Sequence, residues 1–150
     1  MALAILTIAN SIAALEVAGV RIRDLDQIPD AVQERDCPIL IPEVINFVTD
    51  LVITRDSTGA DSYALKTATY TINYTFLYAP VGSDRTGLNR FDDFVRKAFA
   101  IIDAVVLNST ITGLIDITPQ NTLQWSVVLD PSGNAFMGCM MAFSITEFIN

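Results

Sequence analysis

The chain has 150 residues, a formal net charge of −8 and no histidine, with 17% charged and 51% apolar residues. This length suits one domain with a single core, and the acidic balance argues against a basic surface for nucleic acid or an anionic membrane. Typical domains contain about a quarter charged residues, so the low share here indicates that much of the surface is either uncharged or covered by partners.

The first fifteen residues, MALAILTIANSIAAL, predict an amphipathic helix that ends near Gly19. The segment lacks the basic start of a signal peptide, and it is too short and polar to span a bilayer. The apolar side chains recur at helical spacing on one face: Ile5, Ile8, Ile12 and Leu15.

At residues 20–25, the alternation of apolar and polar side chains predicts a short strand. The proline-containing residues 26–43 predict a turn of helix and an extended arm, and not a central strand. Between Pro38 and Pro42 this arm is apolar, and it either covers the chain's own core or packs on a neighbouring subunit. In the second case, Leu40→Asp would release folded monomers. The apolar arm residues are Ile39, Leu40 and Ile41.

Residues 45–55 and 63–79 predict two antiparallel strands of a hairpin, with turn residues at 56–62. In the first strand, the odd-numbered residues from 45 to 53 are expected on one face. In the second strand, apolar side chains at even positions from 68 to 78 alternate mainly with threonine. The second strand therefore has two different faces.

The loop GSDRTG at residues 82–87 has the glycine spacing of a phosphate-binding loop. Leu88 and Asn89, however, stand where such a loop needs lysine and a hydroxyl residue. The strand before a phosphate-binding loop is also normally apolar on both faces, unlike this one. We expect a turn from strand to helix here, and no nucleotide binding.

Residues 90–107 predict a helix whose N-terminal end is stabilised by acidic residues. Asp92 and Asp93 stand four residues before Arg96 and Lys97, so they can form ion pairs along the helix and need no catalytic role. The face expected to cover the sheet consists of Phe91, Phe94, Val95, Ala98, Ile102 and Val105.

Three more strands are expected at about 111–117, 123–129 and 136–148, and the turn DPSGN at 130–134 joins the last two. The order of elements predicts one α+β domain covering the whole chain. It contains a mainly antiparallel sheet, with the N-terminal helix and a second helix packed on it.

The sequence offers no recognisable catalytic or metal-binding chemistry. Without histidine, a catalytic triad and His–Cys zinc sites are excluded, and residues 56–62 lack the spacing of a calcium loop. Cys37 and Cys139 are expected as buried, unpaired thiols. We therefore predict a binding or structural protein with no cofactor and no metal, and not an enzyme.

Several segments, in their order and spacing, resemble the tail-terminator (tail-completion) proteins of long-tailed bacteriophages over nearly the whole chain. The segments are VAGV, LDQIPDAVQERDCPILIPE, VTDLVITRDSTG, YTFLYAPVGSDRTG and DPSGNAFMGCMMAFSITEF. The resemblance implies a hexameric ring that caps the head-proximal end of the tail tube, stops its polymerisation and joins it to a head-side connector or stopper protein.

Under this hypothesis the partners are further copies of the chain, the tail-tube protein and the head-side connector. DNA passes through the lumen without specific binding, no membrane is involved, and the protein is made in the host cytoplasm and resides in the tail–neck region of the virion. A neck adaptor or stopper, a tail-tube subunit, and a small-ligand-binding domain or divergent enzyme with an enclosed polar pocket are the alternatives. The candidate subunit-interface residues are Ile39, Leu40, Ile41, Arg85 and Arg90.

Overall fold

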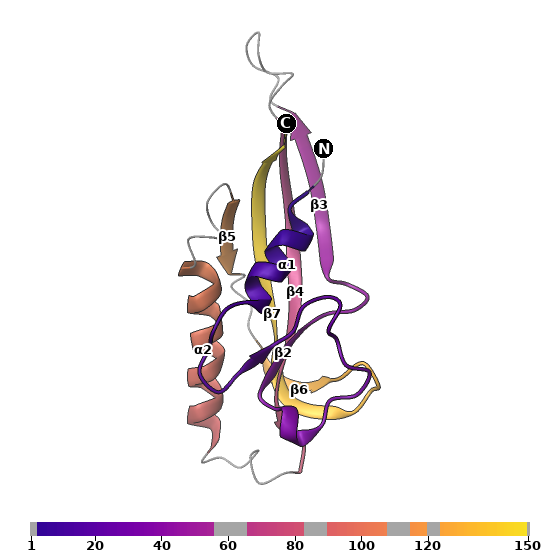
Figure 1. Ribbon diagram of the computed structural model, residues 1–150, viewed down its shortest axis with the longest axis vertical. Coiled ribbons are helices and arrows are strands. Elements are labelled where there is room, and N and C mark those ends of the chain that lie inside the picture. The colour runs from indigo at the N-terminus through magenta and orange to yellow at the C-terminus, as the bar shows by residue number, and fades with distance from the viewer. Residues whose placement is uncertain (1–2, 56–65, 83–89, 108–114, 120–123, 150) are drawn as a thin grey trace.

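The computed structural model describes residues 3–55, 66–82, 90–107, 115–119 and 124–149. Within them, seven strands form one mixed, mostly antiparallel sheet, and two α-helices pack on it. The α+β class predicted from the sequence is therefore confirmed. The sheet is elongated along its longest strands, and both helices are visible in Figure 1.

The elements occur in the following order: α1 (Ile5–Ala13), β1 (Arg21–Ile22), η1 (Glu34–Asp36), β2 (Ile39–Pro42), β3 (Val48–Arg55), β4 (Lys66–Pro80), α2 (Phe91–Leu107), β5 (Ile115–Pro119), β6 (Trp125–Leu129) and β7 (Ala135–Ile149). The helices, the β3–β4 hairpin and the last three strands match the sequence prediction, apart from their bounds. Helix α1 ends before Gly19 because Leu15 already bonds to the carbonyl of Ile12, at 3.1 Å, and closes a tighter turn.

The centre of the sheet is the antiparallel pair β4 and β7, each of 15 residues. Their register runs from Lys66 opposite Ile149 to Pro80 opposite Phe136. Strands β2 and β3 pair with successive parts of β4, whereas β5 and β6 pair with successive parts of β7. Every strand except β1 therefore contacts this central pair directly.

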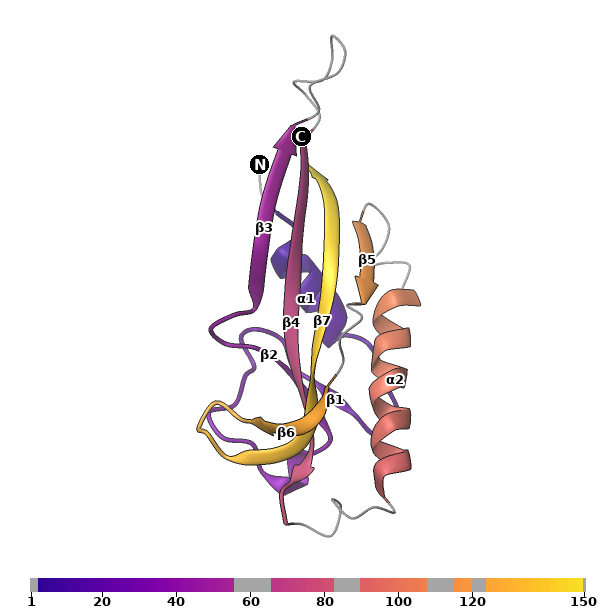
Figure 2. The ribbon, with the colours of Figure 1, turned by 180° about the vertical axis from the view of Figure 1, so that it is seen from behind.

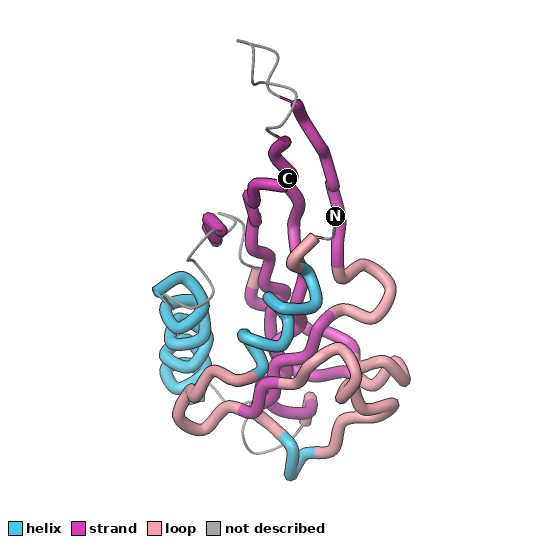
Figure 3. Tube along the Cα trace, turned by 45° about the horizontal axis from the view of Figure 1, so that its top comes forward, coloured by secondary structure: helices cyan, strands magenta, loops and turns pink. Residues whose placement is uncertain are grey.

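The main core lies between the sheet and the two helices, which share one side of it. Figure 3 shows α1 crossing in front of the strands. The helices contribute small and branched side chains such as Ile8, Ile12 and Ala98, which are at most 1% exposed. The alternation predicted for β4 is confirmed from Ala68 to Tyr74, whereas both faces of the strand are buried from Tyr74 to Ala79. The predicted apolar residues are all buried: Ala68, Tyr70, Ile72, Tyr74, Phe76 and Tyr78.

A buried carboxylate joins α1 to the sheet. Glu147 of β7, which is 5% exposed, accepts a hydrogen bond of 2.5 Å from the Tyr70 hydroxyl. Its two oxygens also lie 3.1 and 3.2 Å from the backbone nitrogen of Ala4, the N-cap of α1. Alanine has no side-chain acceptor, so Glu147 supplies the acceptor that the start of the helix needs. Burial, together with this hydrogen bond, raises the pKa of Tyr70.

The alternation predicted for residues 45–53 is wrong for two reasons: β3 begins only at Val48, with Ile45 91% and Phe47 7% exposed before it, and the strand contains a bulge. The bulge lies between Thr49 and Val52, and Asp50 within it has a positive φ of 58°. An extra residue in one strand reverses the face of every side chain that follows. The apolar residues after the bulge are each about half exposed: Leu51 (47%), Val52 (56%) and Ile53 (52%).

The expectation that the arm could not be a central strand is also wrong. Residues 39–42 form β2, which lies inside the sheet between β1 and β4. Both prolines lie where a strand tolerates them. Pro38 precedes β2 and accepts a 3.0 Å hydrogen bond from the Arg21 nitrogen, and Pro42 is the last residue of the strand. The predicted turn of helix in the arm is present as η1.

The arm residues Ile39, Leu40 and Ile41 are 1%, 0% and 3% exposed within the chain's own fold. Leu40 belongs to the main core, whereas Ile39 and Ile41 belong to a second, smaller core with Leu77 and Phe136. These three side chains therefore cover the chain's own core and offer almost no surface to a neighbouring subunit. The structure thus favours the first alternative for the arm and removes these three residues from the candidate interface.

Shortening Leu40 is expected to destabilise the fold itself. Leu40→Ala should lower the free energy of unfolding by about 2–5 kcal/mol, because it leaves a cavity beneath the helices. Leu40→Asp should yield unfolded protein, since it buries a charge without a partner. Urea denaturation followed by circular dichroism measures both effects, and Val44→Ala, at a residue that is 62% exposed, is the control. A folded Leu40→Asp protein would contradict this assignment.

Candidate functional site

On the face of the sheet that points away from α1 and α2, part of the surface is covered by no helix among the described residues. Figure 2 shows this face in front, with β3, β4 and β7 side by side and α1 behind them. Its residues lie opposite one another in rows that cross the strands. One row is Thr49, Thr71, Ser144 and Thr118, and the next is Val52, Thr69, Thr146 and Asp116.

This uncovered face is almost without charge. In the two rows, hydroxyl side chains predominate, and Asp116 is the one charged residue. Apolar side chains are exposed on the same face, with Phe148 at 73% and Met140 at 40%. A neutral, partly apolar surface over several strands is typical of a contact with another macromolecule, because charges are depleted at the centres of interfaces.

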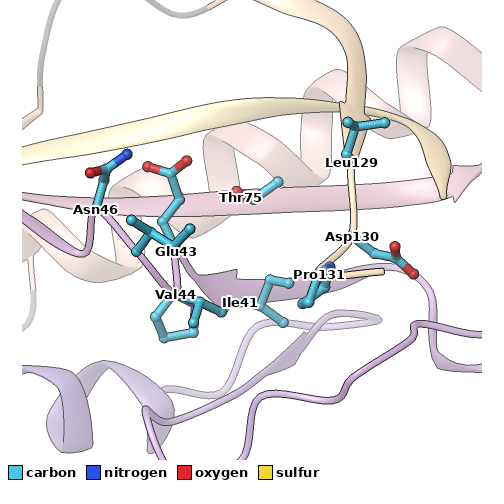
Figure 4. A pocket seen from close by; sticks show the side chains of 10 residues that line it. Ile41, Glu43, Val44, Asn46, Thr75, Leu129, Asp130 and Pro131 are labelled. Carbon is cyan, nitrogen blue, oxygen red and sulfur yellow. The ribbon is translucent and has the colours of Figure 1, made fainter. Parts of the chain in front are cut away.

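A groove of about 360 Å³ adjoins this face where β4 passes from β3 to β2. Thr75 lies at its floor and donates a hydrogen bond to the Met140 sulfur at 3.5 Å. The groove has an exposed apolar rim, and burial raises the pKa of Glu43 beside it. Figure 4 shows eight of its lining residues by name: Ile41, Glu43, Val44, Asn46, Thr75, Leu129, Asp130 and Pro131.

Asp130 holds one wall of the groove in place. Its carboxylate accepts hydrogen bonds from the backbone nitrogens of Val32 (2.9 Å), Ser132 (3.0 Å) and Asn134 (2.8 Å), and from the Asn134 side chain (3.1 Å). Burial alone would raise the pKa of Asp130, but these hydrogen bonds outweigh it and lower the pKa below its usual value. The turn between β6 and β7 is thereby fastened to the arm, and this acid has a structural role.

Arg90 and Lys97, near the start of α2, line a separate polar pocket of about 410 Å³. Asp93 accepts hydrogen bonds from the Tyr78 hydroxyl at 2.6 Å and from Lys97 at 2.9 Å, and both lower its pKa. Asp92 pairs with Arg96 at 3.0 Å. Both ion pairs predicted along this helix are therefore confirmed, and these acids have partners of their own.

The predicted interface residues do not form one exposed surface. Arg90 is exposed and lines the polar pocket together with Pro38, next to the buried side chains at 39–41. Arg85 and the rest of 83–89 lie outside the described residues, as does the turn at 56–62. The groove and the rows across the sheet were missed by the sequence prediction, although the threonines of β4 were a signal for the uncovered face.

Within the described part of the chain, no group of three or more His, Cys, Asp or Glu residues is placed to hold a metal ion. Helices in the same part are all too short or too polar to cross a membrane. Cys37 and Cys139 are buried thiols, and no disulfide joins them, as expected. Burial raises the pKa of Cys139 to about 12, so this thiol stays protonated near neutral pH.

A comparison of the sequence with protein-family models finds no match, and neither does a comparison with curated proteins.

Replacing Asp130 should weaken the fold in a pH-dependent way. Because the folded-state pKa is lowered, the carboxylate contributes stability above its ordinary pKa of about 4 and loses it as the pH falls through the folded-state value. Asp130→Asn should therefore lower the free energy of unfolding by about 1–3 kcal/mol at pH 7 and by less at pH 3.

Urea denaturation at a series of pH values measures this difference, with Asp103→Asn at an exposed residue of α2 as the control. Equal stability of wild type and Asp130→Asn at pH 7 would show that these hydrogen bonds do not stabilise the turn.

Proposed function

We propose that this protein is a structural subunit that assembles into a ring of the tail-terminator kind, at the head-proximal end of a long bacteriophage tail. The observation that carries the proposal is the neutral, helix-free face of the sheet. A monomer gains little from leaving such a face in water, whereas a subunit can cover it or turn it toward a channel.

The resemblance to tail terminators also supports the proposal, because part of it lies in strands of the uncovered face. Of the segments that carry it, VTDLVITR forms β3, YTFLYAP belongs to β4, and the C-terminal segment forms the β6–β7 turn and most of β7. Strand β3 and the second half of β7 help to build the uncovered face, so this part of the resemblance concerns that surface, whereas residues 74–80 lie where β4 pairs with β2.

In the proposed role, the ring contains six copies, the number that the resemblance implies. It ends the growth of the tail tube, presents its other side to a head-side connector or stopper, and resides in the neck region of the virion after synthesis in the host cytoplasm. A chain with a net charge of −8 and a hydroxyl-rich face also suits a channel through which DNA passes without binding.

The arrangement of the acids favours a structural role over an enzymatic one. Glu147, Asp130 and Asp93 each accept hydrogen bonds from their own chain, and these bonds hold a helix start, a turn and a helix face in position. A catalytic carboxylate needs instead to be directed at a substrate.

Electron microscopy of the purified protein tests the proposal. We expect closed rings, and we expect that adding them to growing tail tubes limits tube length. Rings that leave tube growth unchanged would contradict the terminator role and favour a neck adaptor. Long tubes of this protein alone would indicate a tube subunit, and monomers at every concentration would favour a ligand-binding domain that uses the groove.

A further inference from the structure

Strand β3 forms an edge of the sheet that is open to pairing. Among the described residues it pairs with β4 alone, so backbone N–H and C=O groups along its other side have no strand beside them. Proteins usually protect such edges with lysine, proline, inward-pointing charges or a β-bulge. Strand β3 has a bulge between Thr49 and Val52, but residues 51–54 contain no lysine, proline or acid, and three of the four are half-exposed apolar residues.

The opposite edge of the same part of the sheet is β5, which pairs with β7 alone among the described residues. Three antiparallel pairings separate β3 from β5: β3 with β4, β4 with β7, and β7 with β5. The two edge strands therefore run in opposite directions. A second copy that lies beside the first, with the same face forward, brings its β5 antiparallel to β3.

The charges on these two edges are compatible with such a contact. Asp116 is the one charged residue of β5. Beyond the bulge, β3 contains no acid and ends in Arg55. Two chains that each carry a net charge of −8 can meet here without opposing like charges.

We propose that β3 of one copy pairs with β5 of a second copy, so that the sheet and its uncovered face continue from copy to copy. Each copy pairs through β3 with one neighbour and through β5 with the other. An open chain of copies therefore has an unpaired β3 at one end and an unpaired β5 at the other. Such a contact repeats, and it forms a ring where the rotation between neighbouring copies closes and an open filament where it does not. The number of copies and the closure rest on the proposed function, whereas the pairing itself needs only two copies.

A charge on the edge strand tests the pairing. Ile53→Lys places an ammonium at a half-exposed position that the single chain tolerates, and it should raise the concentration needed for half-assembly by about tenfold or more. Leu107→Lys, at a residue of α2 that is 79% exposed, changes the net charge equally and should leave assembly unchanged. Light scattering gives the mass, and circular dichroism shows that each variant is folded.

Engineered cysteines identify the partner edge. Val52 and Asp116 lie on the same face, and residues directly opposite in an antiparallel pair have Cβ atoms about 5 Å apart. A mixture of the Val52→Cys and Asp116→Cys proteins should form disulfide-linked dimers on mild oxidation, while each protein alone should not. A mixture of the Thr54→Cys and Asp116→Cys proteins tests the alternative in which β5 pairs with β3 two residues further along. Cys37 and Cys139 are buried, so the folded protein supplies no competing thiol.

The pairing would be overturned if Ile53→Lys assembled at the wild-type concentration, if neither mixture formed a cross-link, or if the wild-type protein stayed monomeric at high concentration. Cross-linking of Val52→Cys or Thr54→Cys alone would show that β3 meets β3, and would also overturn it. Cross-linked rings that fail to limit tube growth would leave the pairing standing and contradict only the proposed function.

Discussion

The pairing of β4 with β7 is the interaction on which the other elements depend. On one side of the pair, alternate side chains face α1 and α2; at its edges the pair holds β2, β3, β5 and β6. Close approach of the two backbones is essential at one point. A Cβ atom on Gly138 would lie 1.9 Å from the carbonyl oxygen of Phe76, so only glycine fits there. Strand β4 also has a register irregularity between Leu77 and Ala79, near the same point.

The second face of the central pair is divided into two parts. Where β4 pairs with β2, the arm and the β6–β7 turn cover the sheet and form the smaller core around Leu77 and Phe136. Where β4 pairs with β3, the face carries threonines and no helix. Asp130 fastens the covering segments to each other at the border, beside the groove. The uncovered area therefore has a defined limit, set by hydrogen bonds within the chain.

The sequence predicted those parts of the fold that depend on local periodicity. Alternating residues from Ala68 to Tyr78 predicted the faces of β4, and the four-residue spacing of Asp93 and Lys97 predicted their ion pair. The bulge at Asp50 was missed because the apolar residues Leu51, Val52 and Ile53 are consecutive and therefore fit either phase of the alternation. Strand β2 was missed because a proline usually excludes a central strand, and this strand is short enough for its prolines to lie at its boundaries.

The candidate site was less predictable than the fold, since it depends on contacts between distant residues. The groove brings residues 41–46 next to 129–131, and no local pattern links these segments. The edge of β3 could be recognised as apolar from its sequence, but its lack of a second partner depends on the strand order. The sequence indicated one part of the uncovered face, because threonines alternate with the buried residues of β4.

The link between Glu147 and α1 has a consequence for the order of folding during synthesis. Helix α1 leaves the ribosome before all the strands of the sheet, and the acceptor for its first turn lies 143 residues later in the chain. Strand β4 likewise emerges well before β7, its main partner. Until β7 has been made, the nascent chain must therefore keep the apolar face of α1 without its final contacts, and β4 has only β2 and β3 as partners. Chaperones that bind exposed apolar segments would have their longest opportunity during this interval.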